Sequence, residues 1–303
     1  MRIILVGQGP FGEKVLEALL KQGEQIVGVF SPPDKRGEPM KNLAEKSKIN
    51  FYRPALMKDP GVHHIFRQLK PDLVILAFVT DILPEELLSI PSIGTICYHP
   101  SLLPRHRGAS GINWAIIQGD KRTGLTILWS DKGIDTGPIL LQREVEISPD
   151  DTTGSLYFNV LFPMGIEAII EAVGLIKKGQ APRIPQDESK ATYEPPCDDR
   201  VASVDFEKSI HDVYNLIRGC DPQPGAFTTC QGKKVRLYDA RMIPSATGKK
   251  PGEIIAIEEE GLQIAAKGGT ITVGKLRVDK GEKVGAMEFA RSLNAKVGDR
   301  LGT

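Results

Sequence analysis

The sequence predicts an α/β fold: a Rossmann-like, mostly parallel sheet with helices on both faces, followed by a small C-terminal β-barrel-like domain of OB type. Short runs of Val, Ile and Leu alternate with helical patterns through the first half of the chain, as in parallel sheets covered on both faces. Short alternating strands with glycine turns fill the last third, as in small antiparallel sheets or barrels. A proline-rich, charged stretch without periodicity separates the two regions.

The larger domain is expected over residues 1–180. Its strands are expected at 2–7, 25–30, 72–78, 94–99, 124–130 and 138–147. Its helices are expected in the amphipathic segment FGEKVLEALLKQG, around 60–69 and from 152 to 178, with a mixed segment ending at Lys48. Because Val, Ile and Leu dominate the strands, both faces of this sheet are expected to be buried.

The pattern changes near Gly179, where GQAPRIPQDESKATYEPPCDD begins. We expect a linker over 181–204 that crosses the surface, because this stretch is rich in proline and charge. The helix FEKSIHDVYNLIRG then begins a C-terminal β-rich domain, 205–303. Its strands are expected at 233–243, 252–260, 262–267 and 270–278.

The composition is that of an ordinary globular protein, with 41% apolar and 25% charged residues in 303. A net charge of +1 provides no footprint for strong binding to nucleic acid or an anionic membrane. The N-terminus lacks the parts of a signal peptide, and no segment is expected to approach the length of a membrane span. The four cysteines contain no CxxC pair, so we expect no disulfide framework, no bound metal and a cytoplasmic protein with reduced thiols.

The hexapeptide GQGPFG (7–12) fits the GxGxxG fingerprint of dinucleotide-binding proteins and lies between a strand and a helix. That fingerprint also needs an acidic residue at the end of the second strand to hold the ribose. Asp34 arrives only after two prolines, several residues late. We therefore expect that the protein does not bind NAD. The glycines are expected to serve a tight turn and close helix packing, or to hold a lone phosphate.

The strand at 94–99 ends in Cys97, Tyr98 and His99 and leads into a loop rich in proline, histidine and arginine. Residues two apart in a strand point to the same face, so Cys97 and His99 are expected to be neighbours. A protonated His99 would lower the pKa of the Cys97 thiol and make it a nucleophile. The strand pattern instead favours Cys97 as a small buried filler.

Two longer blocks carry a family resemblance. HPSLLPRHRGASGINWAIIQGD (99–120) and GLTILWSDKGIDTGPILLQ (124–142) resemble the folate-dependent formyltransferases. That family includes glycinamide ribonucleotide formyltransferase, methionyl-tRNA formyltransferase and the N-terminal hydrolase domain of 10-formyltetrahydrofolate dehydrogenase, and YHPSLLPRHRGAS is most similar to the last. ATYE (191–194) and IRGCDPQPGAF (217–227) extend the resemblance over nearly the whole chain.

The resemblance implies that residues 1–180 are a formyltransferase catalytic domain with 10-formyltetrahydrofolate as formyl donor. Formyl transfer needs a stabilised oxyanion and a proton for the departing nitrogen. His99 matches the family histidine that polarises the formyl oxygen or handles protons, and Asp135 matches the catalytic aspartate that orients the acceptor. Without the resemblance, His99 would be a structural hydrogen-bond partner and Asp135 an ordinary turn residue.

Cys97 is where this chain departs from the family, because most members have an asparagine two residues before the histidine. That amide donates to the formyl oxygen, and losing such a donor costs about 2.7–4 kcal/mol of transition-state stabilisation. A thiol is a weak donor. The hydrolase domain also lacks this asparagine, so the difference favours that branch, with covalent catalysis by Cys97 as an alternative.

The folate is expected in a slot between two loops, AFVTDILP (77–84) and DKGID (131–135). Main-chain groups suit this role because they present donors and acceptors in fixed geometry. The expected folate-binding residues are Thr80, Asp81, Leu83, Gly133, Ile134 and Tyr193. Core packing is the alternative for Leu83, and a surface contact is the alternative for Tyr193.

The acceptor stays open between water, a small amine and a thiol carrier, with tetrahydrofolate as the released product. Methionyl-tRNA formyltransferase is the main alternative, although SPPDKRGEPMKNLAEKSK is shorter and less basic than the usual tRNA-binding insertion. Basic runs such as GKKVR in the last domain keep a tRNA partner open. A sugar-nucleotide N-formyltransferase and a non-catalytic folate-binding module are further alternatives.

Overall fold

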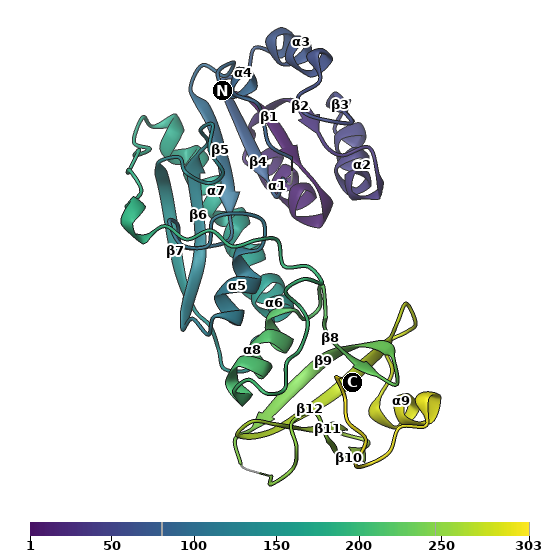
Figure 1. Ribbon diagram of the computed structural model, residues 1–303. Helices are drawn as coiled ribbons and strands as arrows, with labels where there is room; N and C mark the ends of the chain where they lie inside the picture. Colours follow the sequence, from purple (N-terminus) through teal and green to yellow (C-terminus); the bar gives the residue numbers. More distant parts are fainter. Residues whose placement is uncertain (80, 246, 303) are drawn as a thin grey trace. The chain divides into compact units, whose positions relative to one another are not determined.

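The computed structural model describes residues 1–79, 81–245 and 247–302, which form two compact units (Figure 1). The first unit comprises Met1–Gly111, Gly124–Val145 and Phe158–Glu194. The second comprises Ile112–Thr123, Glu146–Tyr157 and the chain from Pro195 onward. The segment expected as a linker, 181–204, is thus divided between the two units at Glu194.

Within the described residues, the first unit is built on a seven-stranded sheet in the order β3-β2-β1-β4-β5-β6-β7. Strands β1 to β5 run parallel and β6 is antiparallel to β5, which confirms the predicted fold class. The strands are β1 (Arg2–Gly7), β2 (Gln25–Phe30), β3 (Phe51–Tyr52), β4 (Leu73–Ala77), β5 (Gly94–His99), β6 (Arg122–Trp129) and β7 (Ile139–Glu146). The helices are α1 (Gly9–Lys21), η1 (Lys35–Gly37), α2 (Glu38–Lys46), α3 (Pro60–Leu69), α4 (Glu85–Leu88), the π-helical η2 (Tyr157–Leu161), α7 (Phe162–Lys177) and η3 (Glu188–Lys190).

The central strands are apolar along their whole length because their side chains alternate between two cores. Ile3 and Leu5 of β1 enter the α1/α7 core, whereas Ile4 and Val6 enter the α3/α4 core on the other face. The α1/α7 core includes Phe11, Val15, Leu16 and Leu19 of α1 and Ala168, Ile169, Ala172 and Val173 of α7. The α3/α4 core includes Val62 and Phe66 of α3 and Leu87 of α4. Helices on both faces therefore leave the strand ends as the accessible edge of the sheet.

Two of the three glycines of GQGPFG serve close packing, and Gly9, with a φ of +60°, serves the turn between β1 and α1. A Cβ on Gly7 would lie 2.8 Å from the carbonyl oxygen of Ala77 in β4. A Cβ on Gly12 would lie 2.5 Å from the sulfur of Met40 in α2. Only glycine lets β1 and α1 approach these neighbours so closely, which accounts for the motif.

The helical run Thr153–Lys177 is 25 residues long and apolar enough to cross a membrane by length and composition. The expectation that no segment approaches this length was therefore wrong, because the predicted helix at 152–178 itself meets the criterion. A core helix of a soluble protein meets it too, so the finding is a weak indication of a span. In this chain Ala168, Ile169 and Ala172 of α7 are buried in the α1/α7 core.

The second unit contains a five-stranded antiparallel sheet in the order β10-β11-β12-β9-β8, counted over the residues that the structure describes. Helices α8 and α9 pack on this sheet through Ile217 and Phe289, among others. The elements are α5 (Gly111–Ile117), α6 (Thr153–Leu156), α8 (Ile210–Gly219), β8 (Ala226–Cys230), β9 (Lys233–Ile243), β10 (Ile254–Glu258), β11 (Gly261–Ala266), β12 (Gly269–Val278) and α9 (Ala286–Leu293). The predicted β-rich C-terminal domain is confirmed, although β8 and α9 were not among the predicted elements.

Candidate active site

The side chains of His99 and Asp135 meet at the end of β5. His99 is the last residue of β5, and Asp135 lies in the loop between β6 and β7. Nδ1 of His99 is 3.4 Å from Oδ2 of Asp135. His99 is 5% exposed, so water screens this pair weakly. The predicted convergence of an imidazole and a carboxylate is thus present in the structure.

The hydrogen bond of Nε2 of His99 determines which of its two ring nitrogens can exchange a proton. Nε2 lies 2.8 Å from the main-chain oxygen of His106. A carbonyl oxygen can only accept, so Nε2 carries a hydrogen in every protonation state of the ring. Nδ1 is then the nitrogen that faces Asp135, as a lone pair in the neutral ring and as a donor in the protonated one. His99 can therefore take up a proton at Nδ1 without losing its anchor.

The Asp135 carboxylate is held by main-chain contacts. Its Oδ2 accepts a hydrogen bond from the backbone N–H of Gly108 at 2.8 Å. The Asp135 backbone has a φ of +57°, a left-handed conformation that is uncommon for residues with a side chain. The amide nitrogen of Gln186 donates to the carbonyl oxygens of both Asp135 and Gly137, at 2.8 Å each. These contacts stabilise a backbone conformation that the loop would not favour by itself.

Gln186 is held in turn by a buried arginine. The Arg107 side chain is 1% exposed. Its Nη2 donates to the amide oxygen of Gln186 at 2.8 Å and to Glu188 at 2.6 Å. The ion pair with Glu188 raises the pKa of Arg107 further above its ordinary value, so its charge is permanent.

A second buried contact ties the loop after β5 to the same segment of chain. Nδ1 of His106 lies 3.2 Å from Oε1 of Glu194, and both side chains are buried. The backbone N–H of His106 donates to the hydroxyl of Thr192 at 2.8 Å. The stretch 186–194, which the sequence predicted as part of a surface linker, thus supports the loop that follows His99 and the loop that contains Asp135. Its lack of periodicity offered no signal for this role.

Cys97 lies on the side of β5 that faces the α3/α4 core and is half-buried against it. Burial, together with the nearby Asp135 carboxylate, raises the pKa of the Cys97 thiol. The lowering that covalent catalysis would require is therefore absent, because the thiolate is disfavoured in these surroundings. Cys97 fits the role of a small filler better than that of a nucleophile.

Three of the six predicted folate-binding residues lie together beside Asp135. The Tyr193 hydroxyl donates to the carbonyl oxygen of Ile134 at 3.1 Å, and these side chains are 57% and 49% exposed. The N–H of Gly133 donates to Asp131 at 3.0 Å, so Asp131 anchors the loop. This exposed cluster is available to a ligand, and its folate contacts stay a prediction.

The other three predicted folate-binding residues lie after β4. Leu83 is buried in the α3/α4 core, so the packing role holds for its side chain. The Asp81 carboxylate accepts the backbone N–H of Met57 at 2.8 Å. Thr80 lies outside the described residues.

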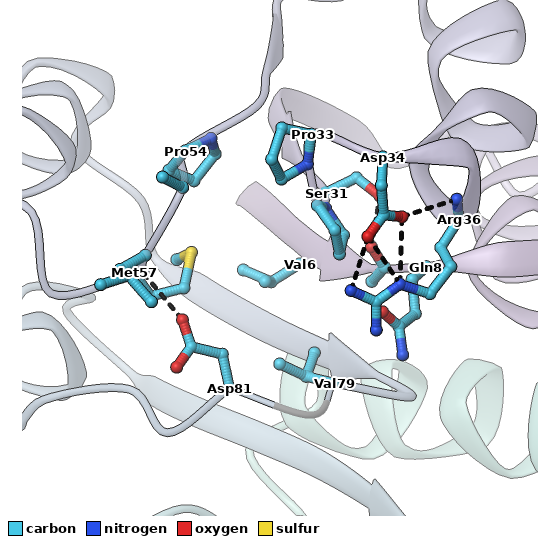
Figure 2. Close-up of a pocket in the computed structure, with 14 residues that line it drawn as sticks. Val6, Gln8, Ser31, Pro33, Asp34, Arg36, Pro54, Met57, Val79 and Asp81 are labelled. Carbon is cyan, nitrogen blue, oxygen red and sulfur yellow. Dashed lines mark hydrogen bonds and ion pairs between the residues drawn. The ribbon is translucent and has the colours of Figure 1, made fainter.

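A cavity of about 330 Å³ opens at the carboxyl ends of β1, β2, β3 and β4 (Figure 2). Its polar lining includes Gln8, Asp34, Arg36 and Asp81, and its apolar lining includes Val6, Pro33, Pro54, Met57 and Val79. Arg36 and Asp34 form an ion pair at 2.7 Å. The amide oxygen of Gln8 is buried and has no hydrogen-bond partner among the described residues. Ligands of open α/β sheets bind at this edge. Asp81 of the lining is one of the predicted folate-binding residues, whereas Gln8 and Arg36 were not predicted as site residues.

The cavity and the His99–Asp135 pair lie on neighbouring strands, since β4 is next to β5 in the sheet. Neither His99 nor Asp135 lines the cavity itself. Within residues 1–79, 81–245 and 247–302, no group of three or more His, Cys, Asp or Glu side chains is arranged to hold a metal ion. The groups that this edge offers to a ligand include the His99 imidazole, the Asp135 carboxylate and the Arg36 guanidinium.

Comparison with known protein families gives two matches along the chain. The formyl transferase model matches residues 1–173. The model of the formyl transferase C-terminal domain matches residues 198–294. Together they cover most of both units.

Known proteins of two kinds are similar in sequence. Human mitochondrial 10-formyltetrahydrofolate dehydrogenase is 39% identical over 307 residues, which cover 95% of this chain and 33% of that protein. Methionyl-tRNA formyltransferase of Acetivibrio thermocellus is 36% identical over 311 residues, which cover 100% of both. This chain thus spans about a third of the length of the dehydrogenase and the whole of the tRNA enzyme. HypX from Aquifex aeolicus in complex with tetrahydrofolic acid shares the fold, with a TM-score of 0.71 and 22% identity over 99% of this chain and 48% of that one.

Proposed function

This chain belongs to the formyl transferase family, and from that premise we propose that it takes the formyl group of 10-formyltetrahydrofolate and passes it to water or a small acceptor, releasing tetrahydrofolate. The observation that carries the proposal is the buried pair of His99 and Asp135, with 3.4 Å between Nδ1 and Oδ2. Both residues match the family motifs that the sequence contains. A cluster of exposed loop residues beside Asp135 offers a surface for the folate.

In the proposed mechanism, Nδ1 of His99 takes the proton of the attacking water or amine. The Asp135 carboxylate stabilises the imidazolium that forms, and the bond from Nε2 to the His106 carbonyl keeps the ring oriented. The tetrahedral intermediate collapses as the same proton returns to the departing folate nitrogen. With water as acceptor the products are tetrahydrofolate and formic acid, which ionises to formate and a proton. Proton transfer of this kind typically accelerates a reaction by about 10²–10⁴-fold.

Water or a small acceptor is favoured by the residue at position 97. The half-buried Cys97 thiol packs against the α3/α4 core and is a weak donor, so it cannot replace an amide that stabilises the oxyanion. The cavity beside Arg36 and Gln8 lies on the same edge of the sheet and has room for a small polar molecule. We propose this cavity as the place of a small acceptor.

Methionyl-tRNA formylation is the second candidate function. One observation favours it: the relative from Acetivibrio thermocellus matches this chain from end to end at 36% identity. The two candidates differ in what must be added to the protein before tetrahydrofolate is released.

The test is to follow tetrahydrofolate release from 10-formyltetrahydrofolate in buffer alone, with small amines and with methionyl-tRNA. Release in buffer alone supports the hydrolase, and release that depends on the tRNA supports the second candidate. Tight folate binding without release under any condition would contradict both and indicate a binding module.

Replacement of Asp135 by asparagine tests the mechanism. Asp135→Asn keeps the shape of the side chain but removes the charge that stabilises the imidazolium, so turnover should fall by about 10²–10⁴-fold. Folate affinity, measured by equilibrium dialysis, should change little. Glu45→Gln, which removes an exposed charge on α2, is the matched control. Unchanged turnover in Asp135→Asn would exclude Asp135 from the proposed role.

A further inference from the structure

Two cysteines of the second unit bring their sulfur atoms close together. The Sγ atoms of Cys197 and Cys220 are 3.7 Å apart, although the residues are separated by 23 positions in sequence. Cys220 follows the last turn of α8 and is fully buried, whereas Cys197 is half-buried at the edge of the second unit's core. One thiol can therefore meet a reagent from solution, and the other cannot.

A main-chain hydrogen bond at Cys220 and side-chain ion pairs near Cys197 hold the two segments in place. The carbonyl oxygen of Cys220 accepts the N–H of Gly225 at 2.8 Å, which closes the turn after α8. Near Cys197, the carboxylate of Asp199 forms ion pairs with Lys234 at 2.9 Å and Arg236 at 2.8 Å on β9. These contacts keep the two sulfur atoms next to each other in the folded protein.

We propose that Cys197 and Cys220 form a reversible intramolecular disulfide by exchange with a small-molecule disulfide. The Cys197 thiolate attacks one sulfur of the small disulfide, whose other half leaves as a thiolate and is protonated. Cys220 then gives up its proton and attacks the sulfur of Cys197, which releases the second half as a thiol. Two cysteine thiols are oxidised, one small disulfide is reduced to two thiols, and both protons end on the released thiols.

The geometry suits these roles. Closure requires the sulfur atoms to move from 3.7 Å to the disulfide bond length of about 2.0 Å, a distance that side-chain rotation of the half-buried Cys197 can supply. When Cys197 is ionised, the S–H of Cys220 donates to its sulfur across the 3.7 Å contact, and this hydrogen bond lowers the pKa of Cys197, which favours the thiolate at the accessible position. The inference does not rest on formyl transfer, because neither sulfur belongs to the candidate active site.

The experiment exposes the full-length folded protein to oxidised glutathione, denatures it and counts the remaining thiols. Wild type should fall from its four thiols to two and should lose the mass of two hydrogen atoms, and dithiothreitol should reverse both changes. Its Tm should rise by several degrees, because the new bond constrains the unfolded chain. Cys230→Ala is the matched control, and it should still lose two thiols. Tryptic peptide mapping then identifies the bonded pair in this variant, because Cys230 otherwise lies in the same tryptic peptide as Cys220.

Single variants separate the two roles. Cys220→Ala should accumulate a stable glutathione adduct on Cys197, because the second thiol is missing. Cys197→Ala should keep its thiols, since Cys220 is buried. Retention of all four thiols by folded wild type, or a disulfide that joins any other pair, would overturn the proposal.

Discussion

Gln186 positions the Asp135 carboxylate without contacting it. Its amide nitrogen bonds two carbonyl oxygens of the Asp135 loop, and its amide oxygen accepts from Arg107. Asp135 occupies a left-handed conformation at φ +57°, so the loop depends on these bonds to keep its shape. Gln186 is therefore a positioning residue that acts through Asp135.

Truncation of this side chain should lower turnover more than binding. In Gln186→Ala the Asp135 loop loses two hydrogen bonds, and a displacement of about 1 Å at the reacting groups can cost up to about 10²-fold in rate. We expect kcat to fall by about 10-fold or more while the KM for the folate changes little. Gln180→Ala, at an exposed glutamine six residues before Gln186, should leave both kcat and KM unchanged. A full kcat in Gln186→Ala would show that the loop holds its shape unaided.

Cys97 can be tested by restoring the amide that most of the family carries. In Cys97→Asn a donor returns near the formyl oxygen, and the rate of transfer to an amine acceptor should rise, by up to about 10²–10³-fold. Cys97→Ala should keep wild-type turnover, since burial raises the pKa of the thiol and disfavours the thiolate. A large loss of turnover in Cys97→Ala would instead mean that sulfur takes part in the reaction.

At this scale the sequence could predict only residues with a recognisable local pattern. His99 and Asp135 lie in two motif blocks, and the structure brings them together. Arg107 and Gln186 meet across 79 positions, a contact that arises from tertiary folding and leaves no periodic trace. Leu83 shows the opposite case, since its side chain faces the core although its loop was predicted to contact folate.

At the scale of elements, α7 shows how two glycines in one helix have opposite roles. A Cβ on Gly165 would lie 2.6 Å from the Tyr98 ring and 3.0 Å from the Phe11 ring. These two rings are in contact with each other in a tilted arrangement, with centroids 4.5 Å apart, so neither can move away easily. Gly174 lies nine residues further along the same helix, and outside that helix's own backbone no atom of the described residues lies within 4 Å of where its Cβ would be.

Alanine at the two positions should therefore change stability in opposite directions. Gly165→Ala overpacks the α1/α7 core and should lower the free energy of unfolding by about 1–3 kcal/mol. Gly174→Ala removes backbone freedom from an uncrowded helical position and should raise it by about 0.5–1 kcal/mol. Urea unfolding of both variants measures the difference. Equal effects would mean that helix propensity, not packing, governs this helix.

The elements that the sequence predicted well have long, uniform patterns. The range predicted for β9, 233–243, coincides with the observed strand, because eleven residues supply a clear alternation. Strand β8 has five residues directly after a proline–glycine turn, and α9 has eight. Strand β4 is also five residues long and was predicted, because LVILA is an unbroken apolar run, whereas AFTTC of β8 and AMEFARSL of α9 contain no such run.

At the scale of the whole molecule, sequence order and spatial grouping differ. Ile112–Thr123 and Glu146–Tyr157 belong to the second unit although the first unit surrounds them in sequence. The amide of Asn113 donates to the carbonyl oxygen of Gly219 at 2.7 Å, as does the hydroxyl of Thr153. A single boundary in the sequence could not predict this arrangement, because it depends on contacts across about a hundred residues.

A fragment ending at Glu194 should consequently be incomplete. Its segments 112–123 and 146–157 would lose α8 as a partner. We therefore expect the fragment to have a lower Tm than the full-length protein and to bind a hydrophobic dye, which the full-length protein should not bind. Asn113→Ala in the full chain should cost about 1 kcal/mol of unfolding free energy, and Asn42→Ala, at an exposed position on α2, should cost none. A fragment as stable as the full chain would contradict the assignment of these segments to the second unit.

The two-sided burial of β1 also restricts which inherited changes the gene can tolerate. Single exchanges among valine, isoleucine and leucine at Ile3 to Val6 keep each side chain in its own core, so the fold should tolerate them. Deletion of one residue within the strand would turn each later side chain toward the opposite core. In a mutational library, aliphatic exchanges should therefore survive throughout this strand while in-frame deletions disappear.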